Sequence, residues 1–177
     1  MKKLFALVLV LALALSAVAF AEEAAEEAIG SPVPMEITYF TPEGINPAVK
    51  SAEEDETVGQ LLNAIVENGD NSAVFASAGV EDVANYELVE LVGLTIEDYD
   101  PETMDEVVLN IKFASAFEQS DKLLALLGLI DGTEVTWQNA DFAIEENGSL
   151  TITFTAEQAE AVAEGTAVIA VLKAIAE

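Results

Sequence analysis

Carboxylates are the side chains of this 177-residue chain with the most chemical potential, and they gather in three short stretches. Calcium takes about six to eight oxygen ligands, so clustered Asp and Glu residues are where a cation site would be sought. The first stretch is a run of four acids, the second is a polar turn, and in the third the acids alternate with other residues. The candidate ligands are Glu53, Glu54, Asp55, Glu56, Asp70, Asp98, Asp100 and Glu102.

Each of these stretches also has a structural explanation. Acids are favoured before and within the first turn of a helix, and residues 53–56 precede a helical pattern. Turns use Asn, Gly, Asp and Ser for local backbone hydrogen bonds. No stretch has the spacing of an EF-hand loop, and Pro101 interrupts the third. The sequence therefore favours structural roles for these acids and keeps a calcium-binding protein as an alternative.

The residue types that the chain lacks exclude several kinds of site. It contains no Cys, no His and no Arg. Disulfides, Cys/His zinc sites, thiol nucleophiles, His-based triads and Arg clamps are therefore excluded. A hydrolase would need two carboxylates about 5 to 10 Å apart, as in glycosidases. With 33 acids some pair reaches that distance by chance, so we expect no catalytic residues, and a carboxylate-pair hydrolase is the remote alternative.

The N-terminus has the pattern of an export signal. Lys2 and Lys3 precede an apolar run at 4–15, and Ala19-Phe20-Ala21 has the A-x-A form of a cleavage site. Twelve helical residues reach only about 18 Å, which is short of a hydrocarbon core of about 30 Å. We therefore expect a signal peptide over 1–21, cleavage after Ala21, a secreted or extracytoplasmic protein, and no stable membrane anchor.

The remainder of the chain is strongly acidic. The net charge is −27, and all 33 acids follow Ala21. Such a charge repels phosphate backbones, so we expect no nucleic-acid partner. Residues 22–34 are rich in Glu and Ala and lack an apolar stripe, which predicts an acidic flexible linker. The 52% hydrophobic content lets residues 35–177 form a single β-rich domain by packing alone.

The second half of the chain carries the clearest strand patterns. Apolar and polar residues alternate over two of its segments, as in strands with one buried face. Asn147-Gly148 and Asp131-Gly132 are typical of hairpin turns. Residues 166–172 are apolar at nearly every position, which predicts a central strand covered on both faces. We expect strands at 107–113, 123–130, 134–138, 142–145, 150–155 and 166–172.

Two helices and one edge strand are also expected. Pro32 and Pro34 precede 35–40, where an edge strand with Ile37 and Tyr39 on one face is the best fit. A loop is expected over 41–56. Thr57-Val58-Gly59-Gln60 has capping-box form and predicts a helix over 58–67. Thr155 begins a second capping-box pattern, which predicts a helix up to Glu164.

Between these helices the pattern is less regular. We expect a short strand at 73–78 and a turn or helical loop at 79–85. The apolar run at 86–96 predicts a strand, with Gly93 as a bulge. The acidic segment that follows is short enough for this strand to form a long hairpin with 107–113.

These elements predict a mainly β fold. Several short strands separated by turns favour an antiparallel two-sheet sandwich, immunoglobulin-like or related, with one or two short helices on connections. An α+β fold is the alternative. We expect Trp137 to fill the centre of the core between the sheets, in preference to stacking on a sugar.

The function expected from these observations is that of an exported, noncatalytic accessory or interaction domain at or outside the cell envelope. Its partner would be a protein, a cell-wall polymer or a glycan, contacted through sheet edges or loops. No cofactor is expected, with calcium as the alternative ligand. The sequence does not distinguish among these partners.

Overall fold

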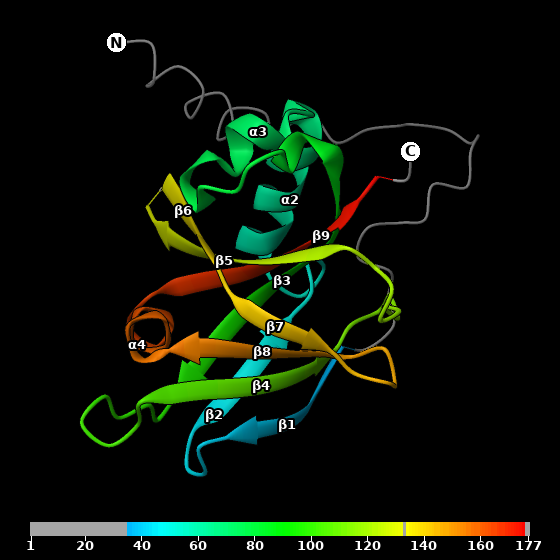
Figure 1. Cartoon of the computed structure of the whole chain (residues 1–177). Coiled ribbons are helices and arrows are strands. Elements are labelled where there is room, and N and C mark those ends of the chain that lie inside the picture. The colour runs from blue at the N-terminus through cyan, green and yellow to red at the C-terminus, as the bar shows by residue number, and fades with distance from the viewer. Residues whose placement is uncertain (1–34, 133, 176–177) are drawn as a thin grey trace.

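The computed structural model describes residues 35–132 and 134–175, which form two antiparallel sheets (Figure 1). The sheet orders are β1-β4-β8-β7 and β2-β3-β9-β5-β6. The mainly β, two-sheet sandwich that the sequence predicts is thus confirmed. The expected signal peptide and linker, residues 1–34, lie outside the described residues. The strands are β1 (Glu36–Thr41), β2 (Asn46–Lys50), β3 (Tyr86–Glu97), β4 (Glu106–Lys112), β5 (Leu123–Asp131), β6 (Glu134–Asn139), β7 (Asp141–Ile144), β8 (Leu150–Thr155) and β9 (Thr166–Ala174).

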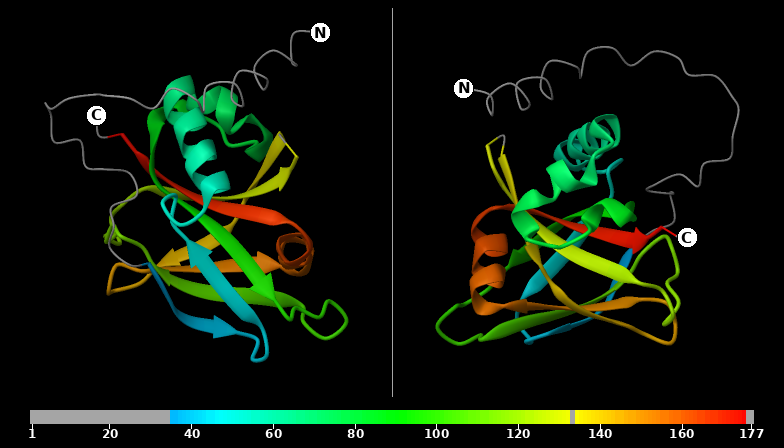
Figure 2. Two further views of the ribbon diagram at one scale, coloured as in Figure 1. Left: turned by 180° about the vertical axis from the view of Figure 1, so that it is seen from behind. Right: turned by 45° about the horizontal axis from the view of Figure 1, so that its top comes forward.

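Helices form a further layer and close one end. The helix α2 (Glu56–Asn68) and the short helix α3 (Asn71–Val74) cover the outer side of the five-stranded sheet, together with the 3-10 turns η1 (Ala76–Ala78) and η2 (Val83–Asn85) (Figures 1 and 2). The helix α4 (Ala156–Glu164) connects β8 to β9 at one end of the sandwich. Among the described residues, no helix covers the outer side of the four-stranded sheet.

The core between the two sheets is built by the alternation seen in the sequence. Val107, Leu109 and Ile111 of β4 are fully buried, and β8 repeats this pattern beside them. Ile169 and Val171 of β9 enter the same core from the other sheet. Removing this apolar surface from water stabilises the sandwich by about 25 cal/mol for each Å².

A second core lies between the five-stranded sheet and the helical layer. The rings of Phe75 and Trp137 meet edge to face there, with centroids 4.8 Å apart. Trp137 is therefore a core residue, as expected, but it lies under the helices and not between the sheets. Gly128 on β5 lies opposite Trp137 on β6. A Cβ on Gly128 would lie 2.6 Å from the Trp137 ring. The glycine makes the space that the indole fills.

β9 occupies the centre of the five-stranded sheet, between β3 and β5. This confirms the prediction that residues 166–172 are covered on both faces. It also explains why the predicted hairpin of 86–96 with 107–113 is wrong. The strand β9 is buried along nearly its whole length. It pairs with the edge of β3 that is not paired with β2, so that edge is not free to pair with β4. The segment after β3 instead crosses to the other sheet, where β4 pairs with β1 and β8.

Three further expectations for the first half are corrected. The loop expected over 41–56 contains β2, an edge strand whose Pro47 is tolerated because it lies at the sheet edge. Residues 73–78 are helical and not a strand, and Phe75 at their centre is fully buried. The bulge of β3 falls between Leu88 and Glu90 and not at Gly93. Gly93 instead admits Val58 of α2, whose Cγ2 would lie 2.9 Å from a Cβ.

The two longer helices begin and end at recognisable caps. Thr155 and Gln158 form the predicted capping box of α4. The helix α2 begins earlier than predicted, because the Asp55 side chain accepts the backbone N–H groups of Thr57 and Val58. It ends at Gly69, which adopts the left-handed conformation (φ 64°) that glycine tolerates best.

Candidate functional site

The described helices leave the outer side of the four-stranded sheet uncovered (Figure 1). We call it the polar face. Its centre consists of Thr38 and Tyr39 on β1, Asn110 on β4, Thr151 on β8, and Glu145 in the β7–β8 turn.

A β-bulge brings two of these residues together. The register passes from Ile37 opposite Ile111 to Tyr39 opposite Asn110, so Thr38 and Tyr39 both face Asn110. Ile37 packs against the core, whereas Tyr39 is 59% exposed. The expectation that Ile37 and Tyr39 share one face is therefore wrong. An inserted residue reverses the alternation and re-aims the side chains that follow it.

Side-chain hydrogen bonds link the polar face across three strands. The Thr38 hydroxyl donates to Oδ1 of Asn110. Asn110 Nδ2 donates to Thr151 Oγ1 at 2.9 Å, and Thr151 Oγ1 donates to the Glu145 carboxylate at 2.6 Å. Each bond fixes the orientation of the next group and polarises it. One N–H of Asn110 and one oxygen of Glu145 keep capacity for a ligand.

These side chains line a shallow concavity of about 860 Å³. Its size falls within the range of small-molecule sites, about 300 to 1,000 Å³. The lining combines one aromatic ring with amides, hydroxyls and two carboxylates, and none of the lining residues within 35–132 and 134–175 is basic. The lining residues are Thr38, Tyr39, Asn110, Gln119, Glu145, Glu146, Asn147 and Thr151.

The wall that carries Gln119 is the loop between β4 and β5. Phe117 anchors this loop, with 5% of its surface exposed and its ring 6.0 Å from that of Phe113, centroid to centroid. The Phe117 N–H donates to the carbonyl of Gly148 at 3.1 Å, which joins the loop to the β7–β8 turn. Both walls of the concavity are therefore fixed to the core and to each other.

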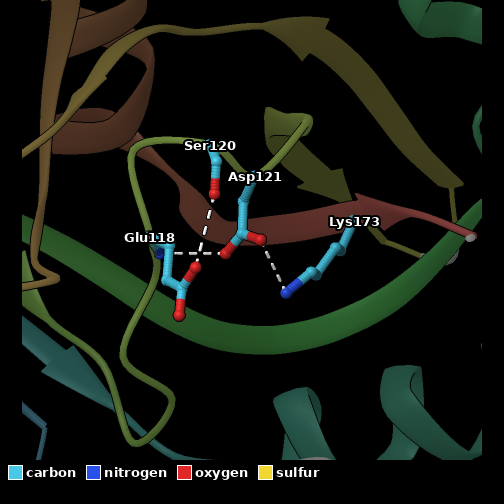
Figure 3. Close-up of polar contacts among 4 residues, drawn as sticks. All are labelled: Glu118, Ser120, Asp121 and Lys173. Carbon is cyan, nitrogen blue, oxygen red and sulfur yellow. Dashed lines mark hydrogen bonds and ion pairs between the residues drawn. The ribbon is translucent and has the colours of Figure 1, made fainter.

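An ion pair holds the far end of the same loop (Figure 3). Asp121 accepts from Lys173 Nζ at 2.8 Å and from the Glu118 N–H at 2.9 Å. These donors, the lysine foremost, hold the pKa of the Asp121 carboxyl below its usual value. The same contact raises the pKa of Lys173. The pair ties the loop to β9 and belongs to its scaffold.

The acids that the sequence singled out lie elsewhere and serve local structure. Glu54 accepts the N–H and hydroxyl of Ser51 at 2.9 and 3.0 Å, and these bonds lower the pKa of its carboxyl. Asp55 caps α2. Glu56 accepts from the Gln60 side chain at 3.0 Å, and Glu53 is exposed in the preceding turn.

The other two stretches are also turns and caps. Asp70 caps the short helix α3 through the N–H groups of Ser72 and Ala73. Asp100 accepts the Glu102 N–H and the Thr103 hydroxyl, each at 3.0 Å. Asp98 has a left-handed backbone (φ 61°) and is exposed, as is Glu102. Within residues 35–132 and 134–175, no three Asp or Glu side chains lie close enough together to hold a metal ion.

The sequence pattern predicts the orientation of two of the five central residues of the polar face. The alternation of β4 and β8 already places Asn110 and Thr151 on the wet side. Thr38, Tyr39 and Gln119 were missed, because a bulge is a property of pairing and because loop packing carries no local signal. The one sequence signal for this site is Tyr39, an aromatic residue in a short segment that is expected to be an edge strand.

Comparisons with protein-family models, with curated proteins and with solved structures gave no match. Among the described helices, none has the length and apolar character needed to cross a membrane.

Proposed function

We propose that this protein is an exported, noncatalytic binding module that holds a carbohydrate polymer on its polar face. The observation that supports the proposal is the concavity in which exposed Tyr39 lies beside the hydrogen-bonded chain from Thr38 to Glu145. Sugars present apolar ring faces and many hydroxyls. An aromatic ring with a polar handle and a set of fixed amides and carboxylates is complementary to both.

The preorganisation of the site supports binding by a rigid surface. Asn110 is only 9% exposed, and it is held from both sides by Thr38 and Thr151. Ordering the side chains before the ligand arrives reduces the entropy cost of binding. A site on strands is also positioned more accurately than a site on loops.

The arrangement of acids supports a noncatalytic role. The two carboxylates that line the concavity, Glu145 and Glu146, are neighbours in one turn. A glycosidase needs its acid and its second carboxylate on opposite sides of the scissile bond. Adjacent exposed acids at one end of a shallow surface suit contact with hydroxyls or cations better than they suit bond cleavage.

Affinity measurements with a panel of neutral and amino-sugar polysaccharides test this function. We expect Tyr39→Ala to weaken binding about tenfold, equivalent to about 1.4 kcal/mol, as for an interface anchor. The control is Val66→Ala, which shortens an equally exposed apolar residue on α2. Binding that survives Tyr39→Ala undiminished, or a protein that binds no polysaccharide of the panel, would reject the proposal.

A further inference from the structure

We infer that Glu90 positions one wall of the concavity and does so in its protonated form, so that a rise in pH loosens this wall and weakens binding on the polar face. The effect on binding rests on the proposed function, whereas the effect on the wall does not. The observation behind both is a buried carboxyl group bonded to the loop that carries Gln119.

Glu90 lies inside the sandwich. The bulge of β3 places it opposite Val171 of β9, which belongs to the core between the sheets. Its side chain accepts the Ser115 N–H at 2.8 Å, and only 1% of the residue is exposed. Among the described residues it is the only buried acid.

A short series of contacts leads from Glu90 to the concavity. Ser115 is followed closely by Phe117, whose N–H donates to the carbonyl of Gly148 at 3.1 Å. The loop and the β7–β8 turn touch here, since a Cβ on Gly148 would lie 3.2 Å from both the N and the O of Phe117. Gln119 comes next in the loop and lines the concavity. A displacement of Ser115 therefore disturbs the wall.

The charged groups around Glu90 do not compensate its charge. On the elements next to it these groups are Glu87 on β3, Lys173 on β9, Lys50 on β2, Glu36 on β1, Lys112 on β4, and Glu118, Asp121 and Lys122 between β4 and β5. Lys173 lies on the same face of β9 as Val171, but it is paired with Asp121 at 2.8 Å. None of these charges is a cause of the altered pKa of Glu90, which burial raises and the Ser115 donors lower.

The protonation of Glu90 is therefore linked to the position of Ser115. With the wall in place the carboxyl is buried and its pKa is raised. With Ser115 displaced, the carboxylate reaches water and its pKa returns towards the ordinary range. Loss of the proton thus favours the displaced wall. The neutral carboxyl still has an oxygen that accepts the Ser115 N–H, so acidic pH keeps the wall in place.

NMR signals of the unliganded protein test the effect on the wall, from about pH 4.5, the ordinary range of a carboxyl, to about pH 7.5. We expect the amide signals of Phe117 and Gln119 to move with pH together with that of Ser115. This movement should be absent from Glu90→Gln, whose amide oxygen still accepts the Ser115 N–H. The control Glu97→Gln removes an exposed acid from the same strand and should behave like the wild type.

Polysaccharide affinity over the same pH range tests the effect on binding. With a polysaccharide that the wild type binds, affinity should fall at least about twofold, the loss expected when half of the molecules leave the binding form. Glu90→Gln should keep its acidic-pH affinity throughout. Glu97→Gln should show the decline of the wild type.

The two measurements separate this inference from the proposed function. A Ser115 signal that titrates while those of Phe117 and Gln119 do not would show that the contact does not position the wall, and would overturn the inference. Wild-type affinity that is constant with pH, or that falls equally in Glu90→Gln, would overturn the effect on binding. A protein that binds no polysaccharide at any pH would reject the proposed function alone, and the signals of the unliganded protein would still decide the role of Glu90.

Discussion

The Glu90 carboxylate accepts the backbone N–H of Ser115 at 2.8 Å, which joins β3 of the five-stranded sheet to the segment that follows β4 of the other. Glu90 is only 1% exposed. Burial raises the pKa of its carboxyl, more than the Ser115 N–H lowers it. A buried carboxyl is favoured in its protonated, neutral form. The burial of Glu90 therefore makes the stability of the fold depend on pH.

The first prediction concerns Glu90→Gln. Because the pKa of Glu90 is higher in the folded than in the unfolded state, its contribution to stability is fully present below the unfolded pKa and is lost as pH rises through the folded pKa. The glutamine variant should therefore be more stable than the wild type at neutral pH, and the difference should shrink towards acid. Urea unfolding of both proteins across this range measures it. A constant difference at all pH values would contradict the assignment.

The second prediction concerns the space above Gly128. Gly128→Ala would place a Cβ 2.6 Å from the Trp137 ring and 2.8 Å from Val168 Cγ2. Overpacking of this kind costs about 1 to 3 kcal/mol of unfolding free energy. In the background of Trp137→Phe, which shortens the ring, the cost of the same substitution should fall. Equal costs in the two backgrounds, measured by denaturant unfolding, would show that the contact is not the cause.

The third prediction concerns the Asp121–Lys173 pair in Figure 3. Asp121→Asn should lower stability by less than about 1 kcal/mol, since Lys173 is 41% exposed and solvent screens the pair. The pKa of Asp121 is lowered in the folded state, so this stability is present above the unfolded pKa and is lost as pH falls through the folded one. Thermal melting of both proteins across the acid range measures this loss, and a stability difference that does not change with pH would contradict the role of the pair.

The fourth prediction tests whether the side-chain hydrogen bonds of Thr151, and not merely a Thr on the outer side of β8, support saccharide binding. Thr151→Val removes the hydroxyl that accepts from Asn110 and donates to Glu145, while it keeps a β-branched side chain. Saccharide affinity should fall about fivefold, as for the loss of one hydrogen bond of about 1 kcal/mol. Thr153→Val changes the next outward residue of the same strand, which does not line the concavity. Equal losses in both variants would contradict the role of Thr151.

Much of this fold follows from the sequence, and the exceptions have physical causes. The alternation over β4 and β8, the uniform apolarity of β9 and the Gly-containing turns predict all six strands of the second half, β4 to β9. Tertiary pairing overrides the local pattern elsewhere. The strand β3 could not be assigned to its sheet from its own residues, because its neighbours β2 and β9 lie far from it in the chain.

The candidate site shows the same division. Asn110 and Thr151 were placed on the wet face by alternation alone. The prediction that Tyr39 shares a face with Ile37 is wrong, because the extra residue Thr38 becomes a bulge only when β1 pairs with β4. The clustered acids were candidate cation ligands, but Asp55 and Asp70 cap helices. Asp is a favoured N-cap residue in any helix, so its presence before a helix does not indicate a ligand site.

Titration of the isotopically labelled protein by NMR tests most directly whether the polar face contacts a saccharide. With an oligosaccharide of the polymer that the protein binds in the affinity panel, we expect the largest shift changes at Thr38, Tyr39, Asn110 and Thr151, and in the side-chain amide of Asn110. Changes confined to the groove around Tyr86 and Ile175, which shares no lining residue with the polar face, or no changes with any saccharide, would contradict saccharide binding by the polar face.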